Sequence, residues 1–162
     1  HWSSIALPVT ALLVASMFLV GYRSDMWIPL GDAVVYIVAA MLVLLWYTVF
    51  ALLASSIARE QGSAIALSIG LWFLFTLLWV LFTTLLAALN GVAVGDTQDQ
   101  GYLIFEGRID LLSPNGVYHH LLETRLDGVE RGVSAFGAYS ATILWTIVPL
   151  YFFQRRLNRL VP

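Results

Sequence analysis

The 162-residue sequence has no cysteine and no lysine, so all eight of its basic residues are arginines. Without cysteine there are no disulfides, no thiolate metal ligands and no thiol redox chemistry, and cysteine usage does not indicate a compartment. The chain contains no G-x-x-x-x-G-K-[ST] phosphate-binding loop, a motif that itself requires lysine. The arginines are scattered until the C-terminus, which is not the basic patch of a nucleic-acid-binding protein. The sequence therefore indicates no nucleic acid, no cofactor and no ATP hydrolysis by this chain.

Charged residues are also scarce. They make up 11% of the sequence, whereas hydrophobic residues make up 60% and the mean hydropathy is +0.84. Soluble domains are about one-quarter charged and about one-half apolar. The hydrocarbon layer of a bilayer, about 30 Å thick, accepts helices of roughly 20 apolar residues whose backbone groups bond internally. Composition thus predicts an all-α, multi-pass protein of the cell membrane, in contact with the lipid bilayer.

Four apolar segments are long enough to cross the membrane, at about residues 5–21, 33–57, 63–90 and 135–153. Because only a short turn separates the second from the third, these two helices should be antiparallel neighbours. Residues 91–133 hold most of the acids and are predicted to lie outside the hydrocarbon. The prediction is a single transmembrane domain over residues 1–162, with four spans and one large outer loop.

Arginines predict the orientation of the four spans. Short segments rich in arginine stay in the cytoplasm, and the tail carries Arg155, Arg156 and Arg159. This places the C-terminus and the Arg59 turn inside, and the 91–133 loop outside. An even number of crossings then returns the N-terminus to the cytoplasm. Arg23, in an outer loop, is an exception that neighbouring acids offset.

The outer loop contains its own helix signal. Ser113 and Pro114 are typical of an N-cap followed by proline at the first helical position. Apolar residues then recur at near-helical spacing, at Val117, Leu121, Leu122 and Leu126. We expect an amphipathic helix on the outer membrane surface, ending at Asp127-Gly128 or Arg131-Gly132.

None of the four apolar segments contains Asp, Glu, Lys, Arg or His. Such groups usually mark ion pathways, proton relays or catalytic centres inside membranes, so this chain is not expected to be an enzyme. His119, His120 and Glu123 in the outer loop are the one candidate metal set. Adjacent histidines point in different directions on a helix, and the usual i, i+4 ligand pair is missing. We therefore predict no metal site and interfacial polar side chains instead.

Small residues form stripes on two of the predicted helices: Gly62, Ala66 and Gly70 on the third, and Gly137 and Ala141 on the fourth. Such stripes let helix backbones approach closely where lipid supplies no hydrophobic drive. Packing within the chain is the favoured interpretation, because four spans must already find one another. A subunit interface is the alternative.

Aromatic residues line one face of the third predicted helix, at Trp72, Phe75, Trp79 and Phe82. Aromatic stripes at helical spacing are ordinary core or lipid contacts. The alternative is the wall of a pathway, in which case the cargo is apolar. Interface anchors are predicted at Trp2, Trp27 and Tyr102.

Three segments of the sequence carry a resemblance to a known family. They are Leu52-Leu53-Ala54-Ser55-Ser56-Ile57-Ala58-Arg59-Glu60 running into Gly62-Ser63-Ala64, then Leu112-Ser113-Pro114-Asn115-Gly116-Val117-Tyr118, and finally Phe152-Phe153-Gln154-Arg155-Arg156. With these segments the chain resembles the C-terminal half of type II ABC exporter permeases. Within that group it is most similar to the copper-enzyme-maturation (nitrous oxide reductase accessory) permeases.

The resemblance implies a fragment of a six-span permease, in which the four spans here are the third to the sixth. It implies a homo- or heterodimer of permeases that moves an unknown substrate, driven by a separate cytosolic ABC ATPase. The Arg59-Glu60-Gln61 turn would contact that ATPase. Two alternatives stay open: an assembly or scaffold protein, and an outer-surface membrane enzyme that uses His119, His120, Glu123 or neighbouring acids.

Overall fold

The computed structural model describes residues 2–25, 27–94, 99–125 and 132–158, and all of its regular structure in these ranges is helical. The helices are α1 (Trp2–Ser24), α2 (Leu30–Ile57), α3 (Gln61–Phe73), the π-helix η1 (Leu74–Leu78), α4 (Trp79–Leu89), α5 (Gln100–Asp110), α6 (Pro114–Glu123) and α7 (Ala135–Leu157). The all-α fold class is therefore confirmed.

Within the described ranges, four helical stretches are long and apolar enough to span a membrane: Ala6–Ser24, Leu30–Ile57, Gln61–Leu89 and Ala135–Leu157. Large apolar side chains point outward along them, for example Leu30 at 86% and Phe136 at 81% exposure. Continuous apolar exposure on this scale would cause a water-soluble monomer to associate, whereas lipid accommodates it. The chain is a polytopic membrane protein, as predicted.

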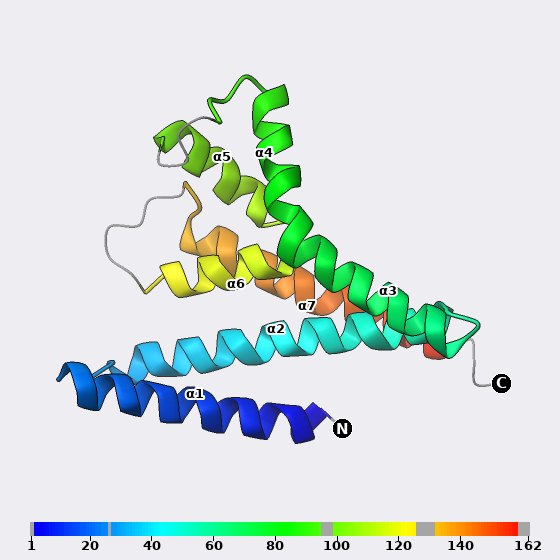
Figure 1. Cartoon of the computed structure of the whole chain (residues 1–162), viewed down its shortest axis with the longest axis horizontal. Helices are drawn as coiled ribbons and strands as arrows, with labels where there is room; N and C mark the ends of the chain where they lie inside the picture. The colour runs from blue at the N-terminus through cyan, green and yellow to red at the C-terminus, as the bar shows by residue number, and fades with distance from the viewer. Residues whose placement is uncertain (1, 26, 95–98, 126–131, 159–162) are drawn as a thin grey trace.

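The third span is not one uniform helix. η1 interrupts it between α3 and α4, and Figure 1 shows α4 leaving the direction of α3 at this point. A π-helical turn places one extra residue in a helical turn, which is a recognised cause of a helix bend. The bend separates α4 from α2 and α7, and α5 packs against α4 instead.

The packing of α2 against α7 forms the frame of the bundle. Trp46 donates its indole N–H to Thr146 Oγ1 at 3.1 Å, and the Arg156 guanidinium donates to the Ser56 carbonyl at 3.2 Å. Both pairs join residues separated by 100 positions in the sequence. Because the two pairs have the same sequence separation although they lie at different heights in the bundle, α2 and α7 run parallel, and both rise by about 1.5 Å per residue.

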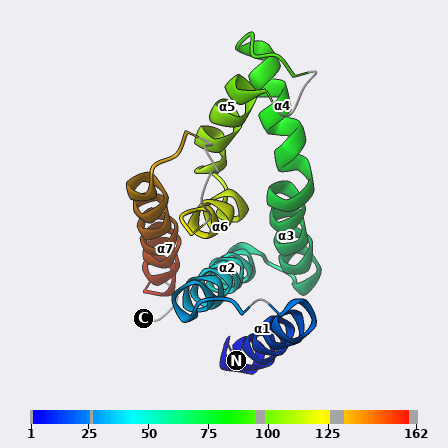
Figure 2. The same ribbon diagram turned by 90° about the vertical axis from the view of Figure 1, so that its left-hand side faces the viewer.

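The segment between α4 and α7 differs from the expected surface loop. It contains two helices, and α6 packs against α2, η1 and α7. Figure 2 shows α6 enclosed by these helices, with α1 lying outside α2. Val117 of α6 is fully buried beside Trp46 and Ala141. The helix beginning at Ser113-Pro114 is as expected, and its apolar face packs against protein; its place at the outer membrane surface stays a prediction.

α6 runs antiparallel to α2, outward from the middle of the bundle. Asn115, near its first turn, meets Tyr47, and Arg125, just beyond its end, lies 3.9 Å from Asp32 at the start of α2. The predicted continuation through Leu126 and the predicted ends at Asp127-Gly128 and Arg131-Gly132 lie partly or wholly outside the described residues. Exposed ion pairs of this kind contribute little stability, so the Asn115 end determines where α6 sits.

Replacing Trp46 by alanine tests the α2–α7 frame. Trp46 is 1% exposed, and Trp46→Ala removes both its packing against Val117 and Ala141 and its hydrogen bond to Thr146. We expect a loss of about 3–5 kcal/mol, the usual range for a buried tryptophan, seen as a lower thermal unfolding midpoint in detergent. Phe136→Ala, on the exposed face of α7, should leave the midpoint nearly unchanged.

Candidate functional site: a polar junction at the π-helical break

One side chain, Asn115, joins α6 to two membrane-spanning helices. Its Oδ1 accepts a hydrogen bond from the Tyr47 hydroxyl of α2 at 3.0 Å. Its Nδ2 donates to the Phe75 carbonyl at 3.2 Å and approaches Thr76 Oγ1 at 3.3 Å, both in η1. We call Tyr47, Phe75, Thr76 and Asn115 the Asn115 junction.

The π-helix explains why the backbone carbonyl at Phe75 meets a side chain. Bonding from residue i to i+5 widens the turn and disturbs the regular i to i+4 ladder. Water is absent from the hydrocarbon, so any carbonyl freed from the ladder needs a partner within the protein. Asn115 supplies a donor there, and the π-helical geometry and the α6 position therefore stabilise each other. Breaks of this type are frequent at functional sites.

The local sequence places Asn115 through its neighbours. Ser113 is the N-cap of α6, its hydroxyl accepting from the Gly116 amide at 3.4 Å, and Pro114 follows in the first turn. Gly116 lies against the Asp110 backbone so closely that any β-carbon would overlap it. Each residue of the segment thus has its own role. Ser113 caps the helix, Pro114 fixes φ in the first turn, Asn115 supplies the amide of the junction, and Gly116 leaves room for the Asp110 backbone.

Two tryptophans hold the corner between α5 and α6. Trp79 of α4 donates its indole N–H to Asp110 Oδ1 at 2.9 Å, and Trp145 of α7 donates to the Leu111 carbonyl at 3.0 Å. Phe75 and Trp145 both lie near the midpoints of their spans, Gln61–Leu89 and Ala135–Leu157. An acidic residue, Asp110, is therefore brought to mid-span depth, whereas Asp32, the acidic residue within the span Leu30–Ile57, lies in the first turn of α2. Within residues 91–133, the helices α5 and α6 fold back against the bundle, and the position of the segment relative to the membrane stays a prediction.

A continuous ladder of aromatic rings passes the Asn115 junction. Phe75 stacks on Phe50 of α2 at 6.1 Å and contacts Trp145 of α7 edge-on at 5.7 Å. It continues along its own span to Trp79 at 5.6 Å, and Trp79 reaches Phe82 at 5.3 Å. Three of the four aromatic residues singled out in the sequence therefore form one ladder, which ends at the exposed Phe82, and Trp72 is exposed outside this ladder.

The two adjacent histidines have different environments. His119 is exposed, whereas His120 is 3% exposed and bridges α5 and α6. Its Nε2 lies 2.9 Å from the Gly107 carbonyl and its Nδ1 lies 2.8 Å from Glu123 Oε2. The prediction of interfacial polar side chains fails for His120, which instead holds the α5–α6 pair together. No group of three His, Cys, Asp or Glu side chains suited to a metal occurs among the described residues.

Tyr102, expected to be an interface anchor, is also buried. It is 3% exposed, and its hydroxyl lies 3.2 Å from Thr84 Oγ1 of α4. Trp27, at 57% exposure, packs its ring on Phe18 of α1 at 5.1 Å. The side chain of Trp2 lies outside the described residues.

The other predicted sites lie away from the Asn115 junction. Arg59, Glu60 and Gln61 form an exposed turn between α2 and α3, where the Ser63 hydroxyl bonds the backbone of Glu60. Figure 1 shows this turn at the same end of the bundle as the end of α7.

The small-residue stripes have separate environments. Gly62, Ala66 and Gly70 are exposed, and a β-carbon at either glycine would meet no other described atom within 4 Å. Among the described residues, no helix approaches this stripe closely, and the packing partner of the stripe stays a prediction. On α7, Ala141 is buried in the core cluster, while the nearest neighbours of a Gly137 β-carbon are Ser134 and Val133 of the preceding residues.

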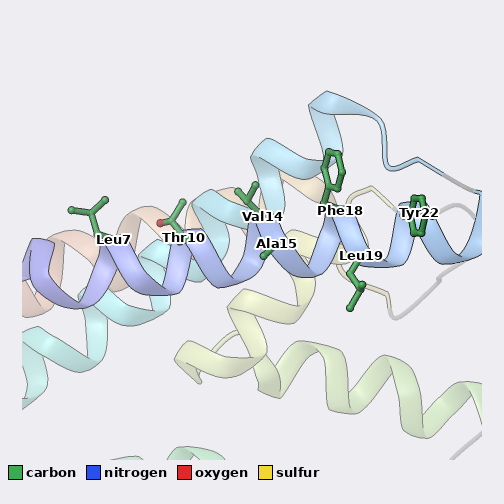
Figure 3. Close-up of a pocket in the computed structure, with 8 residues that line it drawn as sticks. Leu7, Thr10, Val14, Ala15, Phe18, Leu19 and Tyr22 are labelled. Carbon is green, nitrogen blue, oxygen red and sulfur yellow. The ribbon is translucent and has the colours of Figure 1, made fainter.

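An apolar hollow on α1 is lined by Leu7, Thr10, Ala11, Val14, Ala15, Phe18, Leu19 and Tyr22. Figure 3 shows these side chains along a single helix, and Thr10 already bonds the Ala6 carbonyl of its own helix at 2.7 Å. Ligand sites usually combine apolar walls with several converging polar groups. This hollow has only Thr10 and Tyr22, so we treat it as a lipid-facing surface.

Residues 3–159 match the model of a family described as ABC-2 family transporter protein. The chain belongs to the ABC-2 transporter family. It is accordingly a membrane permease component of an ABC transporter, in which the membrane component has no ATPase of its own. Searches of the curated proteins and of the solved structures found no match. The Asn115 junction, at the centre of the matched region, is the candidate site of conformational change in this ABC-2 permease.

Changing Asn115 to leucine tests the junction. Asn115→Leu removes the contacts to Tyr47, Phe75 and Thr76, at roughly 0.6 kcal/mol for each hydrogen bond inside a membrane protein. A total of about 2 kcal/mol predicts roughly thirtyfold faster amide hydrogen exchange in α6. His119→Leu, on the exposed face of the same helix, is the matched control. Equal exchange rates in the two variants would show that Asn115 does not hold α6.

A methyl group at Gly116 tests the tight corner. Gly116→Ala forces a β-carbon into the Asp110 backbone, and overpacking of this kind costs about 1–3 kcal/mol. We expect a lower thermal unfolding midpoint in detergent. Gly31→Ala in α2, where a β-carbon meets no described atom within 4 Å, should leave the midpoint unchanged or slightly higher. An unchanged midpoint for Gly116→Ala would contradict the close approach.

Proposed function

We propose that this chain is the membrane-spanning subunit of an ATP-driven ABC exporter, and that a separate cytosolic ATPase supplies the energy. The family match over residues 3–159 is the observation that carries this proposal. The absence of lysine supports the separate ATPase, because the phosphate-binding loop of such enzymes requires that residue. The substrate is unidentified, and export is the direction that the resemblance to type II exporters implies.

The exposed turn of Arg59, Glu60 and Gln61 is the proposed contact with the ATPase. It carries a positive and a negative side chain at the tip of the α2–α3 hairpin, and it shares an end of the bundle with Arg155 and Arg156. Arginine-rich ends stay in the cytoplasm, so this end faces the ATPase, and both ends of the chain described here are cytoplasmic. The turn leads directly into α3, which ends at the π-helical break.

In this proposal, the turn transmits movement of the ATPase to the Asn115 junction. α3 packs against α2, so a push on the turn moves α3 together with the α2–α7 frame, whereas α4 beyond η1 contacts neither α2 nor α7 among the described residues. The motion is then concentrated at η1, where Asn115 joins α3 and α4 to α6. Two arrangements of such a hinge would expose the aromatic ladder of Phe75, Trp79 and Phe82 alternately to the two sides. A ladder of this composition favours an apolar or aromatic cargo.

We further propose that the chain corresponds to the C-terminal half of a six-span permease of the copper-enzyme-maturation group. The permease functions as a homo- or heterodimer. The exposed stripe of Gly62, Ala66 and Gly70 supports dimer formation, because a second helix can approach it closely. The alternative of an outer-surface enzyme has less support, since His119 is exposed and His120 is engaged with Gly107 and Glu123.

Exchanging the charges of the turn tests the ATPase contact. Arg59→Glu combined with Glu60→Arg keeps the total charge and the Ser63 hydroxyl contacts to the Glu60 backbone, and it removes the Glu60 carboxylate that accepts from the Ser63 amide in the α3 capping box. When the complete open reading frame is expressed with its neighbouring genes, we expect an ABC ATPase to co-purify with the wild type. The amount of ATPase that co-purifies with the exchanged variant should be at least tenfold lower, because like charges then face each other across a close contact.

The control for this experiment is Arg23→Glu, which reverses an exposed arginine in the last turn of α1, at the opposite end of α2 from the Arg59 turn. This variant should retain the ATPase. Loss of the ATPase in both variants would indicate a general effect of charge, and the Arg59 turn would no longer be assigned as the ATPase contact. If no ATP-binding protein accompanies the wild type, the coupled-permease proposal itself fails and the scaffold alternative takes its place.

A further inference from the structure

A cleft of about 650 Å³ lies between the C-terminal halves of α2 and α7, at the arginine-rich end of the bundle. Its walls are apolar, with Leu53 and Ile57 from α2 and Val148 and Phe152 from α7. Arg155 and Arg156 line it at the end where both helices finish. No acidic side chain lines the described part of the cleft.

The parallel register of α2 and α7 produces this shape. Trp46 and Thr146 bring the helices together at mid-span, and Arg156 and Ser56 join them again near their ends. Between these two contacts the cleft extends from Phe50 and Trp145 toward Ile57 and Arg156. Seven residues of helix correspond to about 10 Å, which is long enough to hold the upper part of a fatty acyl chain.

The two arginines are available to an anion. Arg156 uses its Nε and Nη2 groups on the Ser56 carbonyl, one of the last carbonyls of α2, and this contact fixes the position of its guanidinium. A guanidinium has five N–H donors, so Arg156 has further donors that do not take part in the contact with Ser56. Arg155 is exposed beside it, and among the described residues neither arginine lies within 4.0 Å of a carboxylate oxygen.

We propose that this cleft binds one anionic phospholipid, with the phosphodiester headgroup on Arg155 and Arg156 and an acyl chain against Leu53, Val148 and Phe152. Charge complementarity and position together identify the occupant. The apolar walls lie within the spans Leu30–Ile57 and Ala135–Leu157, and the arginines lie at the ends of these spans, where headgroups meet hydrocarbon. A zwitterionic lipid would bring a cationic group to the same two arginines and is disfavoured.

The bound lipid would connect the two frame helices below their mid-span contact. Because its headgroup and acyl chain touch both α2 and α7, it would stabilise the end of the bundle next to the Arg59 turn. The proposal concerns a lipid site and requires only that the chain spans a membrane. Failure of the ATPase experiment would leave it intact.

Native mass spectrometry of the full chain in detergent, with added phosphatidylglycerol or phosphatidylcholine, tests the site. Each basic residue near an anionic headgroup contributes about fivefold in affinity, so Arg155→Gln should weaken phosphatidylglycerol binding about fivefold. The double variant Arg155→Gln/Arg156→Gln should weaken it roughly twenty-five-fold. Arg59→Gln, at the same end but outside the cleft, should change it less than twofold. Water-soluble glycerophosphoglycerol should not compete.

Two further variants separate lipid binding from loss of fold. Arg156→Lys keeps the charge and should retain phosphatidylglycerol, whereas Val148→Trp fills the cleft and should exclude it with both arginines present. Equal retention of the two lipids, or an equal loss in Arg59→Gln, would overturn the proposal. A change of oligomeric state in Val148→Trp without a change in bound lipid would show that the cleft receives a protein helix instead.

Discussion

The hydrogen bonds of Asn115 are the interaction on which the arrangement of this permease depends. A polar side chain at mid-span depth is costly unless its donors and acceptors are engaged, because hydrocarbon offers no water to replace a missing partner. Asn115 finds partners in Tyr47 of α2 and in the backbone and side chain of η1. The same contacts keep α6 inside the bundle and provide a partner for a carbonyl at the π-helical break. Neither feature is readily stable without the other.

The structure separates a frame from a more loosely attached part. α2 and α7 form the frame, since they are joined at mid-span by Trp46 and Thr146 and near their ends by Ser56 and Arg156. α4 diverges from this frame beyond η1, and α5 and α6 fill the space between them (Figures 1 and 2). α3 packs along α2 up to the break, so the bend at η1 is the point where the third span leaves the frame.

The motif from Leu112 to Tyr118 shows how a weak sequence pattern can specify a site. Ser113 and Pro114 follow ordinary helix-start rules, and the sequence alone predicts their role. Asn115 and Gly116 have no such local signal. Their requirements arise from η1, Tyr47 and the Asp110 backbone, which are distant in sequence or in the preceding helix. The motif was recognised by resemblance, and only the packed structure explains why these two residue types occur in it.

Sequence alone determined the membrane class, the approximate location of the four spans and the start of α6, because these follow from hydropathy over about 20 residues and from local capping rules. It could not place residues 99–125. Their acids, glycines and histidines are typical of an aqueous loop, and hydropathy does not register polar groups that satisfy one another in pairs, such as Trp79 with Asp110 or His120 with Gly107. The burial of α6, the break in the third span and the exposure of the Gly62 stripe were decided by tertiary contacts. Each depends on partners that the chain brings together only when it folds.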